Sequence, residues 1–238
     1  MSSDTFDLIM AASGRNALGE GLMTEVIAQL RAANGRPVFL TGADGAFSAG
    51  LNLKEVAALD RAGMTRFLGL LDDLVDALYG YRGPTVACIN GHAIAGGCVV
   101  ALCCDYRVAT ADASVRIGLN EVALGLEFPP KILELVRRRV PPGSIDRVVL
   151  EGALHDPRMA LHLGLVDEVA SDVGAAARAA LTRLAAAPRA EYLAAKRSLR
   201  GTLDLTTEQR RYFDDHIVPA WCATALKERV TAVLKRRV

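Results

Sequence analysis

Short apolar runs alternate with longer amphipathic segments along the first half of the chain, and this pattern predicts strands and helices in turn. Apolar residues dominate positions 37–41, which read PVFLT, and positions 84–90, which read PTVACIN. Such runs are typical of strands buried on both faces of a sheet. Further strands are predicted at 6–11, 106–110, 115–118 and 165–169.

Helices are predicted where apolar residues recur every three or four positions. Segment 64–81 is the clearest case, with Phe67, Leu71, Leu74 and Leu78 at helical spacing. The other predicted helices cover 19–33, 98–104, 131–140, 145–151, 157–163, 175–187, 190–199 and 207–235. The pattern therefore predicts an α/β core of repeated strand-strand-helix units, followed by a helical C-terminal region.

Composition and charge narrow the class of protein. The 238 residues fit one large domain or two small ones, and 51% hydrophobic with 23% charged residues indicates a folded globule. The formal net charge is +1 and aromatic residues make up 5%. Neither value favours a nucleic-acid-binding or membrane-surface protein, because such proteins usually carry a basic excess.

The cysteines and the N-terminus bear on the compartment. The five cysteines are an odd number and form no CxxC pair, which favours a reducing environment. No apolar stretch reaches the length of a membrane span, and the N-terminus does not resemble a signal peptide. We therefore expect a soluble, cytoplasmic protein. The histidines show no ligand spacing, so no metal site is predicted.

Two glycine-rich segments each lie between a predicted strand and a predicted helix. They are 42–50, which reads GADGAFSAG, and 91–97, which reads GHAIAGG. Glycine lets backbone N–H groups approach a ligand, and the start of a helix adds positive potential. Two such loops could offer two donors to one developing oxyanion. Without further information, two ordinary tight turns are an equally good interpretation.

Three segments in order along the chain carry a family resemblance. They are Ala46–Glu55 (AFSAGLNLKE), Asn90–Asp105 (NGHAIAGGCVVALCCD) and Ile117–Gly125 (IGLNEVALG). Together they resemble the crotonase superfamily of enoyl-CoA hydratases and isomerases, collinearly from about Asn16 to Val169. The resemblance implies the crotonase (ClpP/crotonase-like) fold, with ββα units in a spiral and a helical C-terminal trimerisation region. We expect a catalytic core over 1–173 and the helical region over 174–238.

The resemblance also assigns residues. In this family the thioester oxygen of an acyl-CoA lies between two backbone N–H groups, which here belong to Leu51 and Gly96. The hydratases use two glutamates, and this chain keeps one as Glu121 but has Val99 in place of the other. Burial among apolar neighbours is expected to raise the pKa of Glu121 toward neutrality. In isolation, Glu121 would be interpreted as a surface ion pair or a cap.

Contacts to coenzyme A follow from the same resemblance. The segment Asn16-Ala17-Leu18 and Ala49 are expected to hold the adenine, beside Leu51 and Gly96 at the thioester. Lys54 is a candidate phosphate contact, although a solvated lysine is an equally good interpretation. Coenzyme A is part of the substrate, so no separate cofactor is expected.

Within the family, the motifs FSAGLNL, IGLNE and LGLEFPPKIL are similar to those of the mitochondrial-type Δ3,Δ2-enoyl-CoA isomerases. A double-bond shift needs one base, whereas hydration usually needs two carboxylates, so an isomerase of fatty-acid β-oxidation is preferred. Asp112, Glu127 and Glu134 are possible accessory acids if the fold brings them near Glu121. Three alternative functions remain open: a hydratase, another enolate-forming enzyme and a non-catalytic acyl-CoA-binding homologue.

A homotrimer or a dimer of trimers is expected. Two loop positions depart from the family pattern, Asn52 and Ala95.

Overall fold

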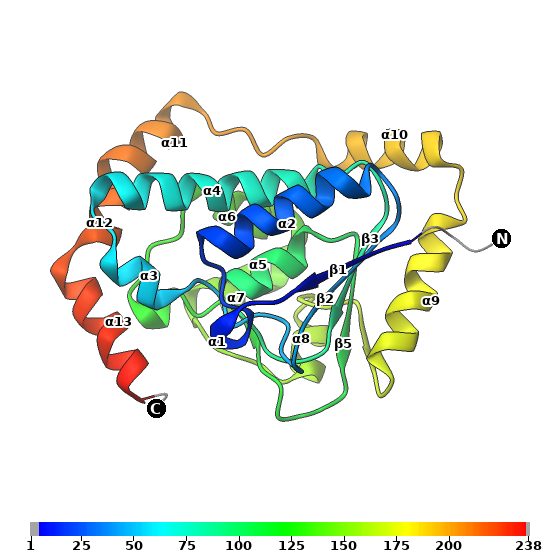
Figure 1. The fold of residues 1–238 in the computed structure, drawn as a ribbon, viewed down its shortest axis with the longest axis horizontal. Helices are drawn as coiled ribbons and strands as arrows, with labels where there is room; N and C mark the ends of the chain where they lie inside the picture. Colours follow the sequence, from blue (N-terminus) through cyan, green and yellow to red (C-terminus); the bar gives the residue numbers. More distant parts are fainter. Residues whose placement is uncertain (1–4, 237–238) are drawn as a thin grey trace.

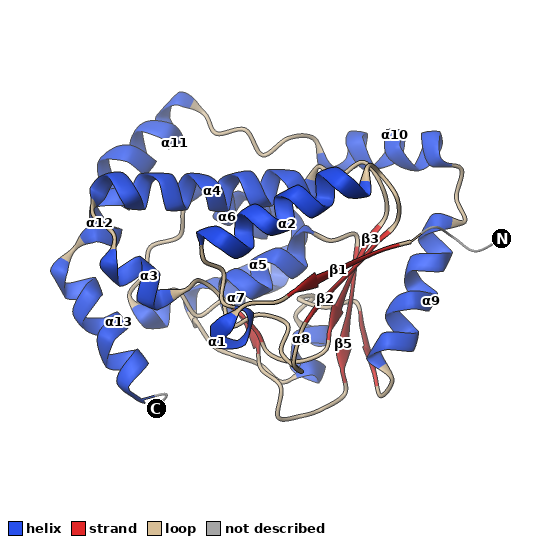
Figure 2. Ribbon diagram, in the orientation of Figure 1, coloured by secondary structure: helices blue, strands red, loops and turns tan. Residues whose placement is uncertain are grey.

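A five-stranded parallel sheet forms the centre of the computed structural model, which describes residues 5–236 (Figure 1). Across the sheet the order is β1 (Phe6–Met10), β2 (Val38–Gly42), β3 (Thr85–Ile89), β5 (Tyr106–Thr110) and β7 (Glu168–Ala170). Every neighbouring pair is parallel, with Leu8 opposite Leu40 and Leu40 opposite Ala87. Parallel strands need crossover connections, so helices join them and cover both faces (Figure 2).

Helices lie on both sides of this sheet. In Figure 1, α2 (Glu20–Ala33), α4 (Arg61–Tyr79) and α5 (Gly96–Cys103) lie on one side and α9 (Val173–Ala185) lies on the other. Ala177, Ala180 and Leu181 of α9 form a buried cluster with Phe39 and Val86 of the sheet. The small alanine side chains let this helix approach the strands closely.

A second, two-stranded parallel sheet pairs β4 (Ala93–Ile94) with β6 (Ile117–Gly118). Each of these short strands follows a long strand of the main sheet, so the predicted strand-strand-helix order is present after β3 and after β5, whereas β1 and β2 are each followed directly by helices. Isolated bridges between Ser48 and Ala93 and between Leu18 and Leu51 extend the same layer. Sequence analysis treated 91–97 as a loop and missed β4, because a two-residue strand has no periodicity to detect.

The remaining elements are α1 (Ser13–Asn16), α3 (Leu53–Ala58), α6 (Pro130–Arg139), α7 (Ile145–Leu150), α8 (Pro157–His162), α10 (Arg189–Arg200), α11 (Thr207–Tyr212), α12 (Val218–Cys222), α13 (Thr224–Arg236) and the short turns η1 (Val122–Leu124), η2 (Pro142–Ser144) and η3 (Phe213–Ile217). The strand predicted at 165–169 is displaced to β7. The amides of Leu165 and Val166 bond the carbonyl of Ala160, so this apolar stretch completes the end of α8.

The single long helix predicted over 207–235 is wrong. A π-helical turn at η3 separates α11 from α12, and the extended backbone of Ala223 separates α12 from α13. These three helices wrap past one end of α4 and descend beside α3 (Figure 1). Lys227 donates to the carbonyl of Leu59 at 2.9 Å, and Arg61 donates to that of Asp214 at 3.1 Å.

The predicted division at 173–174 coincides with the start of α9 and stays a prediction. Over residues 5–236, no helix combines the length and apolarity needed to cross a membrane.

Candidate active site

The two glycine-rich loops meet at the ends of β2 and β4. Leu18 donates its amide to the carbonyl of Gly50 at 2.8 Å and accepts from the amide of Asn52 at 2.9 Å. In such a parallel bridge the residue between these two partners, Leu51, points its own N–H to the opposite side. That side faces the beginning of α5.

Gly96 is the first residue of α5, and the helical hydrogen bonds begin only with Val99 donating to Ala95 at 3.0 Å. The N–H of Gly96 therefore has no acceptor within its helix. A Cβ on Gly96 would lie 3.4 Å from the nitrogen of Leu51, and a Cβ on Gly50 would lie 3.4 Å from the nitrogen of Gly96. The two amide groups thus border one small space that only glycine leaves open.

Ala95 holds the turn into α5 in a demanding conformation. Its φ of 49° and ψ of −117° lie in a region that glycine adopts freely and alanine does not. Its amide donates to the carbonyl of Gly118 at 2.8 Å, and the amide of Ile94 donates to that of Ser48 at 3.0 Å. These two hydrogen bonds hold the turn in its strained conformation and so fix the direction of the Gly96 N–H.

Glu121 faces this space from the segment that follows β6. Its carbonyl accepts from the amides of Leu124 at 3.0 Å and Leu126 at 2.9 Å, which fixes the backbone. The residue is 6% exposed, and its Oε2 atom is buried without a hydrogen-bond partner in the described part of the chain. Desolvation by burial raises the pKa of Glu121 from 4.5 to about 7, in the direction that sequence analysis expected.

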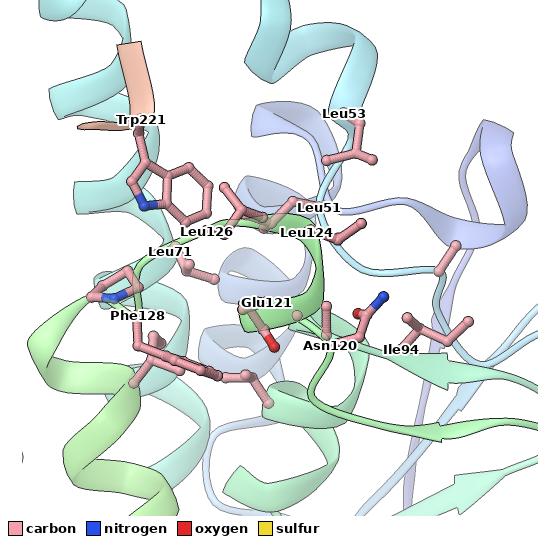
Figure 3. Close-up of a pocket in the computed structure, with 16 residues that line it drawn as sticks. Leu51, Leu53, Leu71, Ile94, Asn120, Glu121, Leu124, Leu126, Phe128 and Trp221 are labelled. Atoms are coloured by element: carbon pink, nitrogen blue, oxygen red, sulfur yellow. The ribbon is translucent and has the colours of Figure 1, made fainter. Parts of the chain in front are cut away.

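The pocket around Glu121 is lined almost entirely by apolar side chains (Figure 3). Its walls are Ala49, Leu51, Leu53, Leu71, Ile94, Ala95, Gly96, Val99, Asn120, Glu121, Leu124, Leu126, Phe128, Pro129, Ile132 and Trp221. Glu121 is the one ionisable side chain among these lining residues. The pocket therefore places a single carboxylate beside two free backbone donors.

The candidate accessory acids lie elsewhere. Asp112 accepts from the amide of Ser114 at 2.8 Å, and Glu134 pairs with Arg138 at 2.7 Å. Glu127 accepts from the hydroxyl of Tyr212. None of the three lines the pocket, whereas Val99 does, the residue that the family resemblance matched to the first glutamate of the hydratases. We therefore find no second carboxylate opposite Glu121 among the described lining residues.

A second cavity adjoins the first and is rich in basic groups. The two share Ala49, Leu51, Leu53 and Ile94, and the second is also lined by Ser13, Gly14, Arg15, Ala17, Asn52, Lys54, His92 and Arg116. Sequence analysis proposed Ala17, Ala49 and Lys54 here but missed Arg15 and Arg116. Arg15 lies directly before the Asn16-Ala17-Leu18 segment, while Arg116 reaches the cavity only through tertiary packing.

The side chains of Asn16 and His92 hold the loops by hydrogen bonds to the backbone. Asn16 is 2% exposed and does not line either cavity. Its side-chain amide donates to the carbonyls of Ala43 and Ala46, at 3.0 and 2.8 Å, and its own carbonyl accepts from Ser48 Oγ at 2.8 Å. His92 Nδ1 accepts from the amide of Arg116 at 2.9 Å, as a turn histidine would.

No metal site accompanies this arrangement in the described residues. Within 5–236, no group of three or more histidine, cysteine, aspartate or glutamate side chains is placed to hold an ion. The site combines an apolar pocket, the carboxyl group of Glu121 with its raised pKa, two backbone N–H donors and an adjoining cavity lined by basic residues. Such a set suits proton transfer next to a carbonyl on a ligand with an anionic tail.

Comparison with known proteins gives the family. The model of the enoyl-CoA hydratase/isomerase family matches residues 10–237. This chain belongs to that family. Mouse mitochondrial enoyl-CoA delta isomerase 1 is 35% identical over 179 residues, covering 74% of this chain and 62% of the mouse protein. The match thus spans about three fifths of that relative's length.

Other family members widen the range of activities. A probable enoyl-CoA hydratase of Mycolicibacterium paratuberculosis is 31% identical over 219 residues, covering 87% of this chain and 84% of the relative. The crystal structure of human mitochondrial Δ3-Δ2-enoyl-CoA isomerase superposes with a TM-score of 0.90 at 28% identity, covering 97% of this chain and 93% of that one. These likenesses confirm the expected crotonase fold.

Proposed function

We propose that this family member shifts a double bond from the 3- to the 2-position of an enoyl-CoA ester. The observation that carries the proposal is that Glu121, whose Oε2 atom is buried without a hydrogen-bond partner in the described residues, lines the same pocket as Leu51 and Gly96. A second observation supports it, because Val99 lines the pocket where a hydratase has its other acid.

The chemistry follows from these groups. The thioester oxygen accepts from Leu51 and Gly96, and Glu121 removes a proton from C2. The resulting negative charge develops on that oxygen, where two fixed donors stabilise it. The protonated Glu121 then returns the proton to C4, and the double bond moves to C2–C3. Every atom and electron is retained, so no water or external reductant takes part.

Lys54, Arg15 and Arg116 would bind the phosphates of coenzyme A in the adjoining cavity. All three carry a positive charge, and phosphate recognition by such side chains is common. Ala17 and Ala49 line the same cavity and would contact the nucleotide. The pathway would be the oxidation of unsaturated fatty acids.

Assembly and location stay predictions from the sequence. A homotrimer or dimer of trimers would be measured by sedimentation or light scattering. A cytoplasmic location also stays a prediction, and the mouse and human relatives are named as mitochondrial.

Assays of the purified protein with 3-enoyl-CoA and 2-enoyl-CoA test the activity, beside the Glu121→Gln variant. Isomerisation that is lost in the variant supports the proposal. Hydration of 2-enoyl-CoA by the wild-type protein would instead favour the activity named for the mycobacterial relative. Neither reaction, together with tight binding of acyl-CoA, would indicate a non-catalytic homologue.

A further inference from the structure

One end of the apolar pocket adjoins the basic cavity, and the other end does not. Ala49, Leu51 and Ile94 also line the basic cavity, whereas Phe128 and Trp221 line the apolar pocket alone. Figure 3 shows Trp221 and Phe128 on the side away from Ile94. An acyl chain whose thioester lies at the two backbone donors therefore extends toward the indole.

Trp221 is held firmly in place. The residue is 2% exposed, and its Nε1 donates to the carbonyl of Glu127 at 2.9 Å. The carboxylate of the same Glu127 accepts from the hydroxyl of Tyr212. Displacing the indole would break its hydrogen bond and expose a large apolar surface, so the side chain forms a fixed wall.

The backbone before Trp221 has an unusual feature that aims this side chain. The π-helical turn Phe213–Ile217 joins α11 to α12, and both its first and last residues are buried, at 3% and 0% exposure. A π-turn adds one residue to a helical turn and rotates everything that follows; such turns are frequent at functional sites. Trp221 lies on α12, directly after this turn, and lines the pocket.

We propose that Trp221 sets the upper limit of acyl-chain length and restricts this protein to short- and medium-chain enoyl-CoA esters. The proposal rests on the proposed function, because it takes the pocket to be the acyl site. Each further methylene that the pocket buries raises kcat/KM about fourfold. A chain long enough to reach the indole gains nothing more, because the wall cannot accommodate it.

The experiment measures kcat/KM for 3-enoyl-CoA esters of six, eight, ten, twelve and fourteen carbons. Wild-type protein is expected to show a rise that stops, or reverses, at one chain length. In Trp221→Ala that break moves to longer chains by at least two carbons. Because truncating a buried tryptophan destabilises a protein, Trp221→Leu is measured as well and is expected to move the break less far. Trp221→Phe retains an aromatic wall and should move it least.

Leu150→Ala serves as the control, because Leu150 is 67% exposed at the end of α7 and lies outside both the pocket and the region expected to form the trimer. Its chain-length profile should match that of the wild type. A break at the same chain length in the wild type and in all folded Trp221 variants would overturn the proposal. A wild-type rate that keeps rising through fourteen carbons would overturn it too.

A binding series separates this proposal from the proposed function. Affinities of saturated acyl-CoA esters of the same lengths are measured by calorimetry, which needs no turnover. If no ester is isomerised but the break in affinity moves in Trp221→Ala, the activity is refuted and the role of Trp221 stands. An affinity break that does not move refutes the role of Trp221 independently.

Discussion

Glu121 is a buried residue and the side chain of Asp105 is 9% exposed, yet the surroundings of these two carboxylates are opposite. Asp105 lies 2.7 Å from Arg200 and 2.9 Å from Lys196, and it also accepts from the backbone amide of Thr85 at 2.7 Å. Glu121 lies among apolar side chains that include Val99 and Leu124, and its Oε2 atom has no hydrogen-bond partner within residues 5–236. One carboxylate is neutralised by two cations, whereas the other is left without any.

The difference separates a structural carboxylate from the proposed catalytic base. Arg200 and Lys196 belong to α10, and they also donate to the carbonyls of Cys103 and Gly83, both at 2.9 Å. Asp105 therefore joins α10 to the end of the sheet through two ion pairs. Glu121 makes no such ion pair among the described residues, and desolvation by burial raises its pKa close to neutrality. Burial without a cationic partner keeps the pKa of a carboxylate near neutrality, where it can exchange a proton.

The largest expected effect is on catalysis. Glu121→Gln keeps the shape of the side chain but cannot accept the C2 proton, so kcat for isomerisation should fall by about 10²–10⁴. Thermal unfolding should show equal or greater stability, since an unpaired buried acid is replaced by a neutral amide. Retention of full activity in this variant would refute the assignment of Glu121 as the base.

Asp105→Asn is expected to act in the opposite way. Removing the negative charge leaves Lys196 and Arg200 buried without a counter-charge, which should lower the free energy of unfolding by about 3–5 kcal/mol. Chemical denaturation measures this loss, and activity per folded molecule should change far less than in Glu121→Gln. Asp7→Asn is a matched control, because Asp7 pairs with Arg178 on the surface at 2.8 Å and should contribute under about 1 kcal/mol.

Much of the reactive site could be predicted from the sequence. Leu51, Gly96 and Glu121 each lie in a contiguous motif of the family resemblance, and the pairing of Ser48 with Ala93 and of Ala93 with Ile117 brings the three motifs to one pocket. The contacts of Asp105 with Lys196 and Arg200 had no such signal, because about 90 residues separate the partners and only tertiary packing joins them. Trp221 was hidden for the same reason, and its helix was predicted as part of one continuous segment.

The pH dependence of stability should also distinguish the two carboxylates. The pKa of Glu121 is raised in the folded state from 4.5 to about 7, so the folded protein holds this proton where the unfolded chain has lost it. Stability from this group is complete below pH 4.5 and is lost as pH rises to about 7, by roughly 3 kcal/mol.

Urea denaturation of the wild type and Glu121→Gln across this range measures the difference. Burial also raises the pKa of Asp72 to about 6, but that group is common to both proteins and cancels. The kcat/KM of the wild type should rise with pH through about 7 as Glu121 ionises. Parallel stability curves for the two proteins would contradict the raised pKa.

The smallest expected effect concerns the backbone beside the reactive carboxylate. Ala95 carries a Cβ at φ 49° and ψ −117°, so Ala95→Gly should relieve strain and raise stability by about 1 kcal/mol after the entropy cost of glycine is included. Ala101 provides the control, because it lies inside α5 with ordinary helical geometry, and Ala101→Gly should destabilise by about 1 kcal/mol. Thermal and chemical denaturation of both variants measure the two signs. Loss of stability in Ala95→Gly would mean that the turn into α5 is not strained. The direction of the Gly96 N–H would then not depend on backbone strain at Ala95.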